Sequence, residues 1–363
     1  MDLGRIHAEL KSRILDDASS LIDDGAFVNG PAVSEFEAEF ASFCGTTHCI
    51  GISSGLDALR LALLALRLEP GEEVLLPALT FIATAEAVTQ AGGRPVLVDI
   101  GEADLNMNAE AAEAALTPRS RALLPVHLYG QMADVRALEA VLGRAGDVAM
   151  VEDAAQAHGT ERDGRRAGAV GTIGAFSFYP AKNLGALGDA GAATTDDPNL
   201  AARLRALREH GQFTKNEHEL DGYTARLDTI QALALLRKLP LLDSWNDQRR
   251  QAATFYDSHL EGVGDLRLPP VPEGSSPVWH LYVVRTGEPD ALASFLTARG
   301  VASGRHYPYP VHLAPAFAGL GYREGEFPVA EAAAGQVLSL PIFPGISEQQ
   351  LEAVVSSVRD YFA

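Results

Sequence analysis

Short apolar segments alternate with segments of helical periodicity through the first half of the chain, and this alternation limits the folds that the chain can adopt. The candidate strands lie at residues 49–52, 73–77, 93–99, 121–126 and 147–151. Helical patterns separate them, as at 58–66 and 134–142. Alternation at this spacing favours a mainly parallel α/β sheet covered by helices on both faces. Ligands of such sheets bind at the carboxyl ends of the strands.

The pattern changes towards the C-terminus. A candidate strand at 278–284 and a candidate helix at 289–299 suggest a smaller α+β domain. The 363 residues also fit about two domains. We therefore expect a large domain over residues 1–245 and a small C-terminal domain over residues 246–363. Near the N-terminus, Ser34 and Glu37 predict a capping box at the start of a helix over 35–42.

The composition argues against several classes of partner. The formal net charge is −19, with the acidic residues scattered, whereas nucleic-acid binding needs a basic face. The most apolar run, residues 56–68, contains three charged residues and is too short to span a bilayer. Cys44 and Cys49 form neither a disulfide framework nor a zinc motif. We expect a cytoplasmic protein that binds no nucleic acid, membrane or metal.

The chemistry centres on Lys182, which stands among small and apolar residues. A lysine in such surroundings is a poor surface residue, and a desolvated lysine is a better nucleophile. Asp153 follows the strand at 147–151, where a carboxylate could face a protonated ring nitrogen. The small-residue turn at 53–57 opens a helix, whose N-terminus could hold a phosphate. Both features are also common helix caps. Together they fit pyridoxal phosphate, although spacing alone leaves this open.

Seven motifs in order along residues 25–345 closely resemble the DegT/StrS-type nucleotide-sugar aminotransferases, a group of fold-type I pyridoxal-phosphate enzymes. The matching segments are SGLDAL at 54–59, PVHLYGQ at 125–131, EDAAQAHG at 152–159, FSFYPAKNLG at 176–185, RLDTIQ at 226–231, HYPYPVH at 306–312 and VLSLP at 337–341. The resemblance implies the fold of these enzymes and a role for each matching residue.

Four residues are expected around the cofactor ring. Lys182 would form the Schiff base and later move the proton between cofactor and substrate carbon. Asp153 would keep the ring nitrogen protonated, Gln156 would bond near the ring hydroxyl, and Phe81 would stack on the ring face. The retained Lys182 also separates this chain from related dehydratases, which carry histidine there.

The phosphate is expected on Ser177 and on the backbone of Ser54, Gly55 and Leu56. The chain departs from the family pattern at two positions. Leu56 stands where the family usually has threonine, so a hydroxyl contact to phosphate is lost. Thr224 stands where the family usually has an asparagine contributed across a dimer interface, so we expect a homodimer with shared sites.

The substrate is expected at a proline-rich loop that approaches the sugar in this family. Its candidate residues are His306, Tyr307, Tyr309 and His312, and packing against the partner domain explains them equally well. His127 and Tyr129 follow a strand end and could support the site from behind.

The resemblance implies an aminotransferase of deoxyamino-sugar biosynthesis. An amino acid such as glutamate would leave its amino group on the cofactor as pyridoxamine phosphate, and a keto-sugar on a nucleoside diphosphate, thymidine diphosphate by expectation, would take it. Gln156 favours amination at C3, because many C4 enzymes of the family carry histidine there. Amination at C4 of a hexose or pentose, a keto-cyclitol substrate and a non-catalytic regulatory role stay open.

Overall fold

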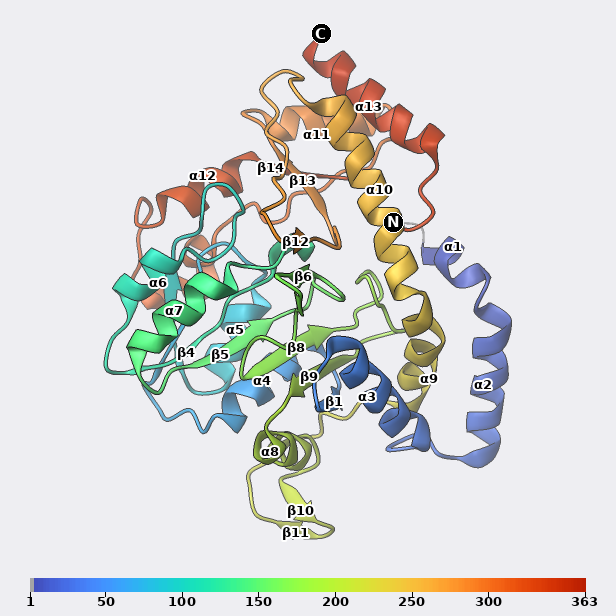
Figure 1. The fold of residues 1–363 in the computed structure, drawn as a ribbon, viewed down its shortest axis with the longest axis vertical. Coiled ribbons are helices and arrows are strands. Elements are labelled where there is room, and N and C mark those ends of the chain that lie inside the picture. Colours follow the sequence, from blue (N-terminus) through green and yellow to red (C-terminus); the bar gives the residue numbers. More distant parts are fainter. Residues whose placement is uncertain (1–2) are drawn as a thin grey trace.

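The computed structural model describes residues 3–363 and has a seven-stranded sheet at its centre (Figure 1). The strand order is β1-β9-β8-β5-β4-β2-β3. Five neighbouring strands, β8 to β3, are parallel, and β9 runs antiparallel to both of its neighbours. The seven strands are β1 (His48–Ile52), β2 (Glu73–Pro77), β3 (Arg94–Val98), β4 (Ser120–Leu123), β5 (Ala149–Asp153), β8 (Ile173–Ser177) and β9 (Gly191–Thr195).

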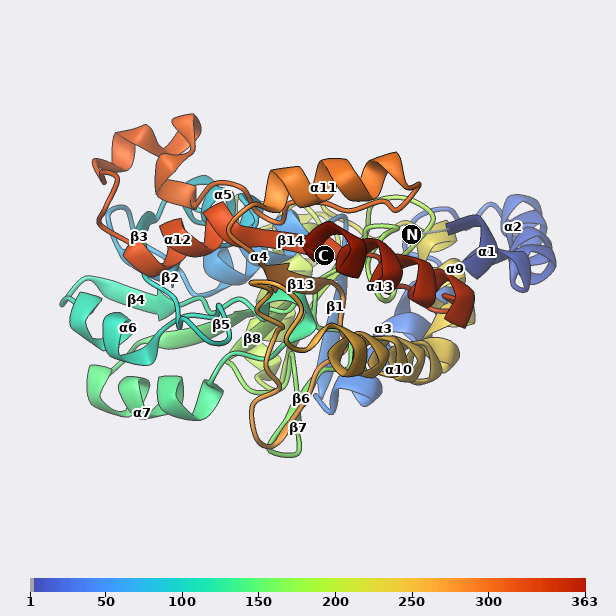
Figure 2. The same cartoon turned by 90° about the horizontal axis from the view of Figure 1, so that it is seen from above.

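Helices cover both faces of this sheet, as its buried strands require. Figure 2 shows α4 and α5 on one side and α6 and α7 on the other. The apolar residues of α4, α5 and α8 pack into one core cluster, and those of α3 and α9 pack into another. These helices are α3 (Pro31–Cys44), α4 (Gly55–Ala65), α5 (Ala83–Gln90), α6 (Ala109–Ala115), α7 (Val135–Ala145), α8 (Pro198–Arg208) and α9 (Thr229–Lys238). At the N-terminus, α2 (Lys11–Asp24) follows the short α1 (Leu3–Ala8).

The predicted capping box is wrong, because α3 begins at Pro31 with Gly30 as its N-cap. Proline is favoured at the first helical position, where its missing N–H costs nothing. The Ser34 hydroxyl donates instead to the Pro31 carbonyl. Glu37 is buried, where it accepts a bond of 2.8 Å from the Gly51 N–H and pairs with Arg208. Glu37 therefore ties α3 to β1 and α8.

The C-terminal part has its own core. The strands β13 (Tyr282–Arg285) and β14 (Val337–Leu340) pair antiparallel and pack with α10, α11 and α13. The helices of this part are α10 (Leu242–Leu260), α11 (Pro289–Ala298), α12 (Pro328–Gln336) and α13 (Glu348–Phe362). The expected boundary at residue 245 falls inside α10, whose second half contributes to this core. The division into two domains stays a prediction.

Three short pairings complete the structure. A three-stranded sheet joins β12 (Ser275–Ser276), β6 (Glu161–Arg162) and β7 (Arg165–Arg166), so the C-terminal part also reaches back to the central region. The hairpin of β10 (Gln212–Thr214) and β11 (Glu217–His218) projects beyond α8 (Figure 1).

Across residues 3–363, no helix combines the length and apolar character that crossing a bilayer needs.

Candidate active site

A cavity of about 650 Å³ lies at the carboxyl ends of β5 and β8. Its wall comes from the start of α4, the loop before α5, the segment after β8 and the loop at 302–307 of the C-terminal part. Most residues predicted for the site line it, namely Ser54, Gly55, Leu56, Phe81, Asp153, Gln156, Ser177, Lys182, His306 and Tyr307. The topology therefore brings residues that lie up to 253 positions apart, Ser54 and Tyr307, to one place, as expected of strand ends in a parallel sheet.

Lys182 reaches this cavity from a tight turn after β8, in which its N–H donates to the Tyr179 carbonyl at 2.8 Å. Its amino group makes no hydrogen bond or ion pair with any residue between 3 and 363. Burial disfavours the charged amine and lowers the pKa of Lys182 to about 8, although the nearby Asp153 opposes this shift. At pH 7 about a tenth of the amine is therefore neutral, far more than for an ordinary lysine, and the neutral form is the nucleophile.

Asp153 ends β5 and is almost fully buried. Burial raises the pKa of its carboxyl group above the ordinary value, and hydrogen bonds from Thr84 and Ala155 counteract that rise. The Thr84 hydroxyl donates to Oδ2 at 2.8 Å, and the Ala155 N–H donates to Oδ1 at 3.2 Å. The carboxylate is thus held in a fixed orientation at the cavity wall, where it could receive a cationic N–H group.

The start of α4 and the end of β8 form a concave edge of the cavity. The Ser54 hydroxyl caps the helix by accepting from the Asp57 N–H at 3.1 Å, and the first N–H groups of a helix have no partner within it. A Cβ atom added at Gly55 would lie 2.5 Å from the Ser177 Cβ, so only glycine allows this approach. Such a helix N-terminus beside a serine hydroxyl suits a phosphate group.

Gln156 links the central sheet to the C-terminal loop. Its Oε1 accepts from the Tyr129 N–H at 2.7 Å, and its Nε2 donates to the Tyr307 hydroxyl at 3.1 Å. The Tyr307 ring lies 5.6 Å from the Phe81 ring, whose side chain is 51% exposed. The Tyr129 hydroxyl donates to the His306 carbonyl. These contacts place two aromatic rings at the mouth of the cavity, where a flat cofactor could stack.

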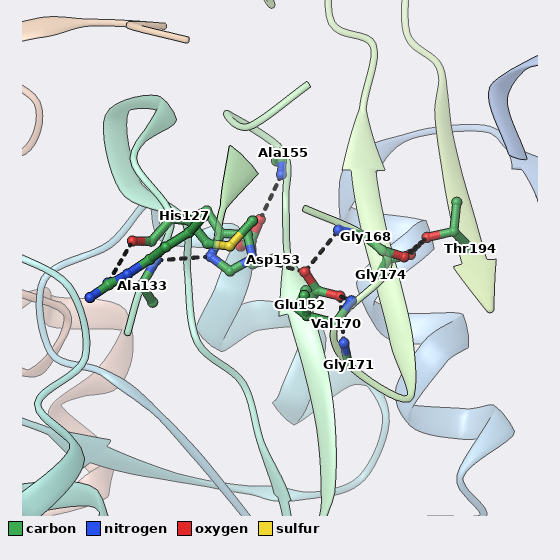
Figure 3. A network of polar contacts seen from close by, with 12 residues as sticks. His127, Ala133, Glu152, Asp153, Ala155, Gly168, Val170, Gly171, Gly174 and Thr194 are labelled. Carbon is green, nitrogen blue, oxygen red and sulfur yellow. Dashed lines mark hydrogen bonds and ion pairs between the residues drawn. The ribbon is translucent and has the colours of Figure 1, made fainter. Parts of the chain in front are cut away.

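A buried polar network lies behind Asp153 (Figure 3). Glu152, fully buried, accepts from the N–H groups of Gly168, Val170 and Gly171 at 2.7–3.0 Å, and His127 Nε2 lies 2.9 Å from its carboxylate. His127 Nδ1 accepts from the Ala133 N–H at 3.3 Å, which places the ring proton on Nε2. His127 lies behind the cavity and is absent from its lining, and a supporting role for it stays a prediction.

Three of the predicted residues do not line the cavity. Thr224 is exposed and lies 3.2 Å from His210 Nε2. Tyr309 is exposed at the surface. His312 is buried against Glu331, which it meets at 2.9 Å. Roles for these three residues in binding cofactor or substrate stay predictions.

Sequence reasoning missed Thr84 and His280. Thr84 lies in the first turn of α5, and His280 reaches the cavity with its Nδ1 3.2 Å from Asn183 Oδ1. A threonine in a helix and a histidine in a predicted strand give no signal of their own. Only the motif around Lys182, which includes Asn183, could have suggested a partner for His280.

The chain is similar in sequence to sugar aminotransferases. A profile of the DegT/DnrJ/EryC1/StrS aminotransferase family matches residues 8–359. The dTDP-3-amino-3,4,6-trideoxy-alpha-D-glucose transaminase of Streptomyces venezuelae is 47% identical over 99% of this chain and 95% of its own length.

Two solved structures agree with the fold. The crystal structure of S. venezuelae DesV in complex with a ketimine intermediate has a TM-score of 0.97 and 47% identity, covering 99% of this chain and 97% of that one. NtdA of Bacillus subtilis with bound cofactor PMP has a TM-score of 0.89 and 30% identity, covering 96% of this chain and 81% of that one. These similarities confirm the predicted fold class, that of the fold-type I aminotransferases.

Proposed function

This chain belongs to the DegT/DnrJ/EryC1/StrS aminotransferase family, and we propose that it aminates C3 of a keto-sugar carried on thymidine diphosphate, with pyridoxal phosphate as cofactor and glutamate or a similar amino acid as donor. The observation that carries the reaction type is the position of Lys182 in the cavity beside the buried Asp153, where its amino group has no hydrogen-bond partner within residues 3–363 and burial lowers its pKa to about 8. The similarity to a transaminase named for a 3-amino sugar on dTDP supports the carbon and the nucleotide.

The residues of the cavity fit the cofactor. Ser177 and the first turn of α4 would hold the phosphate, because Gly55 lets the two approach closely. Asp153 would hold the ring nitrogen and Phe81 would cover a ring face. When bound, pyridoxal phosphate supplies an aldehyde that takes up amino groups and a ring that withdraws electrons.

The chain's own groups then have separable tasks. Asp153, as a buried carboxylate, would hold a proton at the ring nitrogen. In each half-reaction the Lys182 amine would move a proton between the substrate carbon and the cofactor carbon, for which a pKa near the working pH is favourable. Phe81 and Tyr307, whose rings lie 5.6 Å apart, would shield one side of a bound cofactor from water. Donor and acceptor use the same cavity in turn, which gives ping-pong kinetics.

We further propose that the enzyme is a cytoplasmic homodimer. Thr224 supports this, because it is exposed, lies outside the cavity of its own chain and matches the element that crosses the interface in the resembling family. Further exposed apolar residues are Phe27 and Val28, just before α3, and Phe213, on the β10–β11 hairpin. A chain that stayed monomeric at full activity would contradict the proposal.

The test uses purified protein reconstituted with pyridoxal phosphate. We expect a visible absorbance band that glutamate shifts, and a Lys182→Ala protein that lacks the covalent attachment trapped by borohydride. The protein with pyridoxamine phosphate bound is then incubated with thymidine diphosphate sugars that carry a 3-keto or a 4-keto group, and with a free keto-cyclitol. We expect amination of the 3-keto sugar alone, with the position of nitrogen assigned by NMR.

Each outcome decides a different part of the proposal. The absence of any band refutes the cofactor and favours the non-catalytic alternative. Faster amination of the 4-keto sugar moves the reaction to C4. Preference for the free cyclitol refutes the nucleotide-sugar substrate.

A further inference from the structure

The Asp153 carboxylate receives only two hydrogen bonds from the described part of the chain, one on each oxygen. The Ala155 N–H donor belongs to the backbone, so a side-chain substitution does not remove it. The Thr84 hydroxyl is the only side-chain donor of the two, at 2.8 Å, and it belongs to a residue that is fully buried. The two residues lie 69 positions apart, so this contact exists only in the folded protein.

Helix capping does not explain the Thr84 hydroxyl. Ile82 is the N-cap of α5, and no side chain caps this helix. A threonine inside a helix usually returns its hydroxyl bond to the backbone one turn earlier. The hydroxyl of Thr84 is instead directed out of the helix towards Asp153.

A second hydroxyl fixes the direction of this bond. Thr80 Oγ1 lies 2.9 Å from Thr84 Oγ1, and Thr80 lines the cavity. The single hydroxyl proton of Thr84 goes to the carboxylate, which in its ionised form can only accept. Thr84 must therefore accept from Thr80. The two threonines form a chain of donors that ends on Asp153.

We propose that Thr84 is a positioning residue for the reaction: its hydroxyl, supported by Thr80, holds the Asp153 carboxylate ionised and aimed at the ring nitrogen of the cofactor. This inference rests on the proposed function. Burial raises the pKa of Asp153, and the Thr84 bond is the largest influence that lowers it again. The charged and titratable groups that act on the same carboxylate are Lys182, His127 and Tyr307, and the variants below leave all three in place.

The experiment compares the wild-type protein with Thr84→Val, Thr84→Ser and Thr80→Val. The affinity for pyridoxal phosphate is measured by absorbance from about pH 5 to about pH 9, and urea unfolding of each protein without cofactor reports its fold. Valine keeps the shape of threonine and removes the hydroxyl, whereas serine keeps the hydroxyl and removes a methyl group.

A hydrogen bond to a charged group contributes enough that Thr84→Val should weaken cofactor binding about tenfold to a hundredfold at neutral pH. Without the Thr84 donor the carboxyl group of Asp153 keeps its proton to a higher pH, and a protonated carboxyl cannot pair with a protonated ring nitrogen. The loss of affinity in acid should therefore begin about one to two pH units higher. Thr84→Ser should follow the wild type, and Thr80→Val should shift in the same direction by less.

Equal pH curves for the wild type and Thr84→Val overturn the proposal. A loss that is uniform over pH and shared by Thr84→Ser also overturns it, because that pattern shows a packing role. If Thr84→Val does not fold, Thr80→Val decides, and an unshifted acid limb refutes the donor chain. A wild-type protein that gives no band with pyridoxal phosphate refutes the proposed function itself, which is a different result from normal binding by Thr84→Val.

Discussion

The contact between Gly55 and Ser177 gives the sharpest prediction for the phosphate edge of the cavity. In Gly55→Ala the new Cβ would lie 2.5 Å from the Ser177 Cβ and 3.1 Å from its Cα and Oγ. Carbon atoms in favourable contact lie about 3.5–4.0 Å apart, so the start of α4 and the end of β8 must separate by about 1 Å. Overpacking of this kind costs about 1–3 kcal/mol. The helical preference of alanine over glycine returns up to about 1 kcal/mol.

Gly55→Ala should lower the free energy of cofactor binding by more than it lowers the free energy of unfolding. The displaced helix end and the Ser177 hydroxyl can no longer bind one phosphate together. The loss of one hydrogen bond to a charged group costs about 1.5–3 kcal/mol, which is about a tenfold to hundredfold rise in Kd for pyridoxal phosphate. Titration of the protein with cofactor, followed by absorbance, measures this. Urea unfolding of the cofactor-free protein measures the smaller cost to the fold.

Gly143→Ala is the matched control. Gly143 also lies in a helix, α7, and an added Cβ there would meet no atom within 4 Å. This variant should gain up to about 1 kcal/mol of unfolding free energy and bind cofactor normally. If Gly55→Ala binds cofactor as tightly as Gly143→Ala, the phosphate does not lie between α4 and β8 and the reasoning fails.

Three further predictions concern the lysine and two buried charges. Labelling of Lys182 by an aldehyde, measured by mass spectrometry, should increase with pH around about pH 8, because only the neutral amine reacts. Asp153→Asn should move this increase to lower pH, because the Asp153 carboxylate raises the pKa of Lys182. An increase near the ordinary pKa of 10.5 would contradict the prediction. Glu152→Gln puts an amide NH₂ group among four donors and should lower the unfolding free energy by about 3 kcal/mol, whereas a loss below about 1 kcal/mol would show that the network is weak. Arg249→Met orphans the three backbone carbonyls that Arg249 binds and should cost about 2–4 kcal/mol in urea unfolding, and an unchanged midpoint would refute that role.

The sequence predicted the sheet, and most of the residues that it suggested for the site line the cavity, because both follow from local patterns. Buried parallel strands are continuous apolar runs, and strand ends such as Asp153 and Ser177 must meet at one edge. The start of α3 was placed wrongly, since Ser34 and Glu37 have the spacing of a cap but serve contacts with distant parts of the chain. Local pattern cannot distinguish these uses.

The missed residues share one physical cause. The bond from Thr84 to Asp153 and the contact of His280 with Asn183 join positions 69 and 97 apart in the chain. Neither residue type is rare in its element, so composition and period gave no sign of a special role. Thr224 and Tyr309 lie outside the cavity of one chain. Local sequence patterns predict contacts within a chain, and they give no information on contacts with a second chain.

The adjacent acids Glu152 and Asp153 give one short strand two unrelated duties. Successive side chains on a strand point to opposite faces, so Glu152 turns towards the loop at 168–171 while Asp153 reaches the cavity. Glu152→Asp or Asp153→Glu, each a single-base change in a gene, would leave the net charge unchanged but should break a contact. The shorter side chain at position 152 would not reach its backbone donors, and the longer one at position 153 would move the carboxylate away from its position at the cavity wall. A substitution at either position of β5 is therefore expected to disturb one of these two contacts. The loop at 302–307 contributes to the wall of the same cavity from the C-terminal part of the chain.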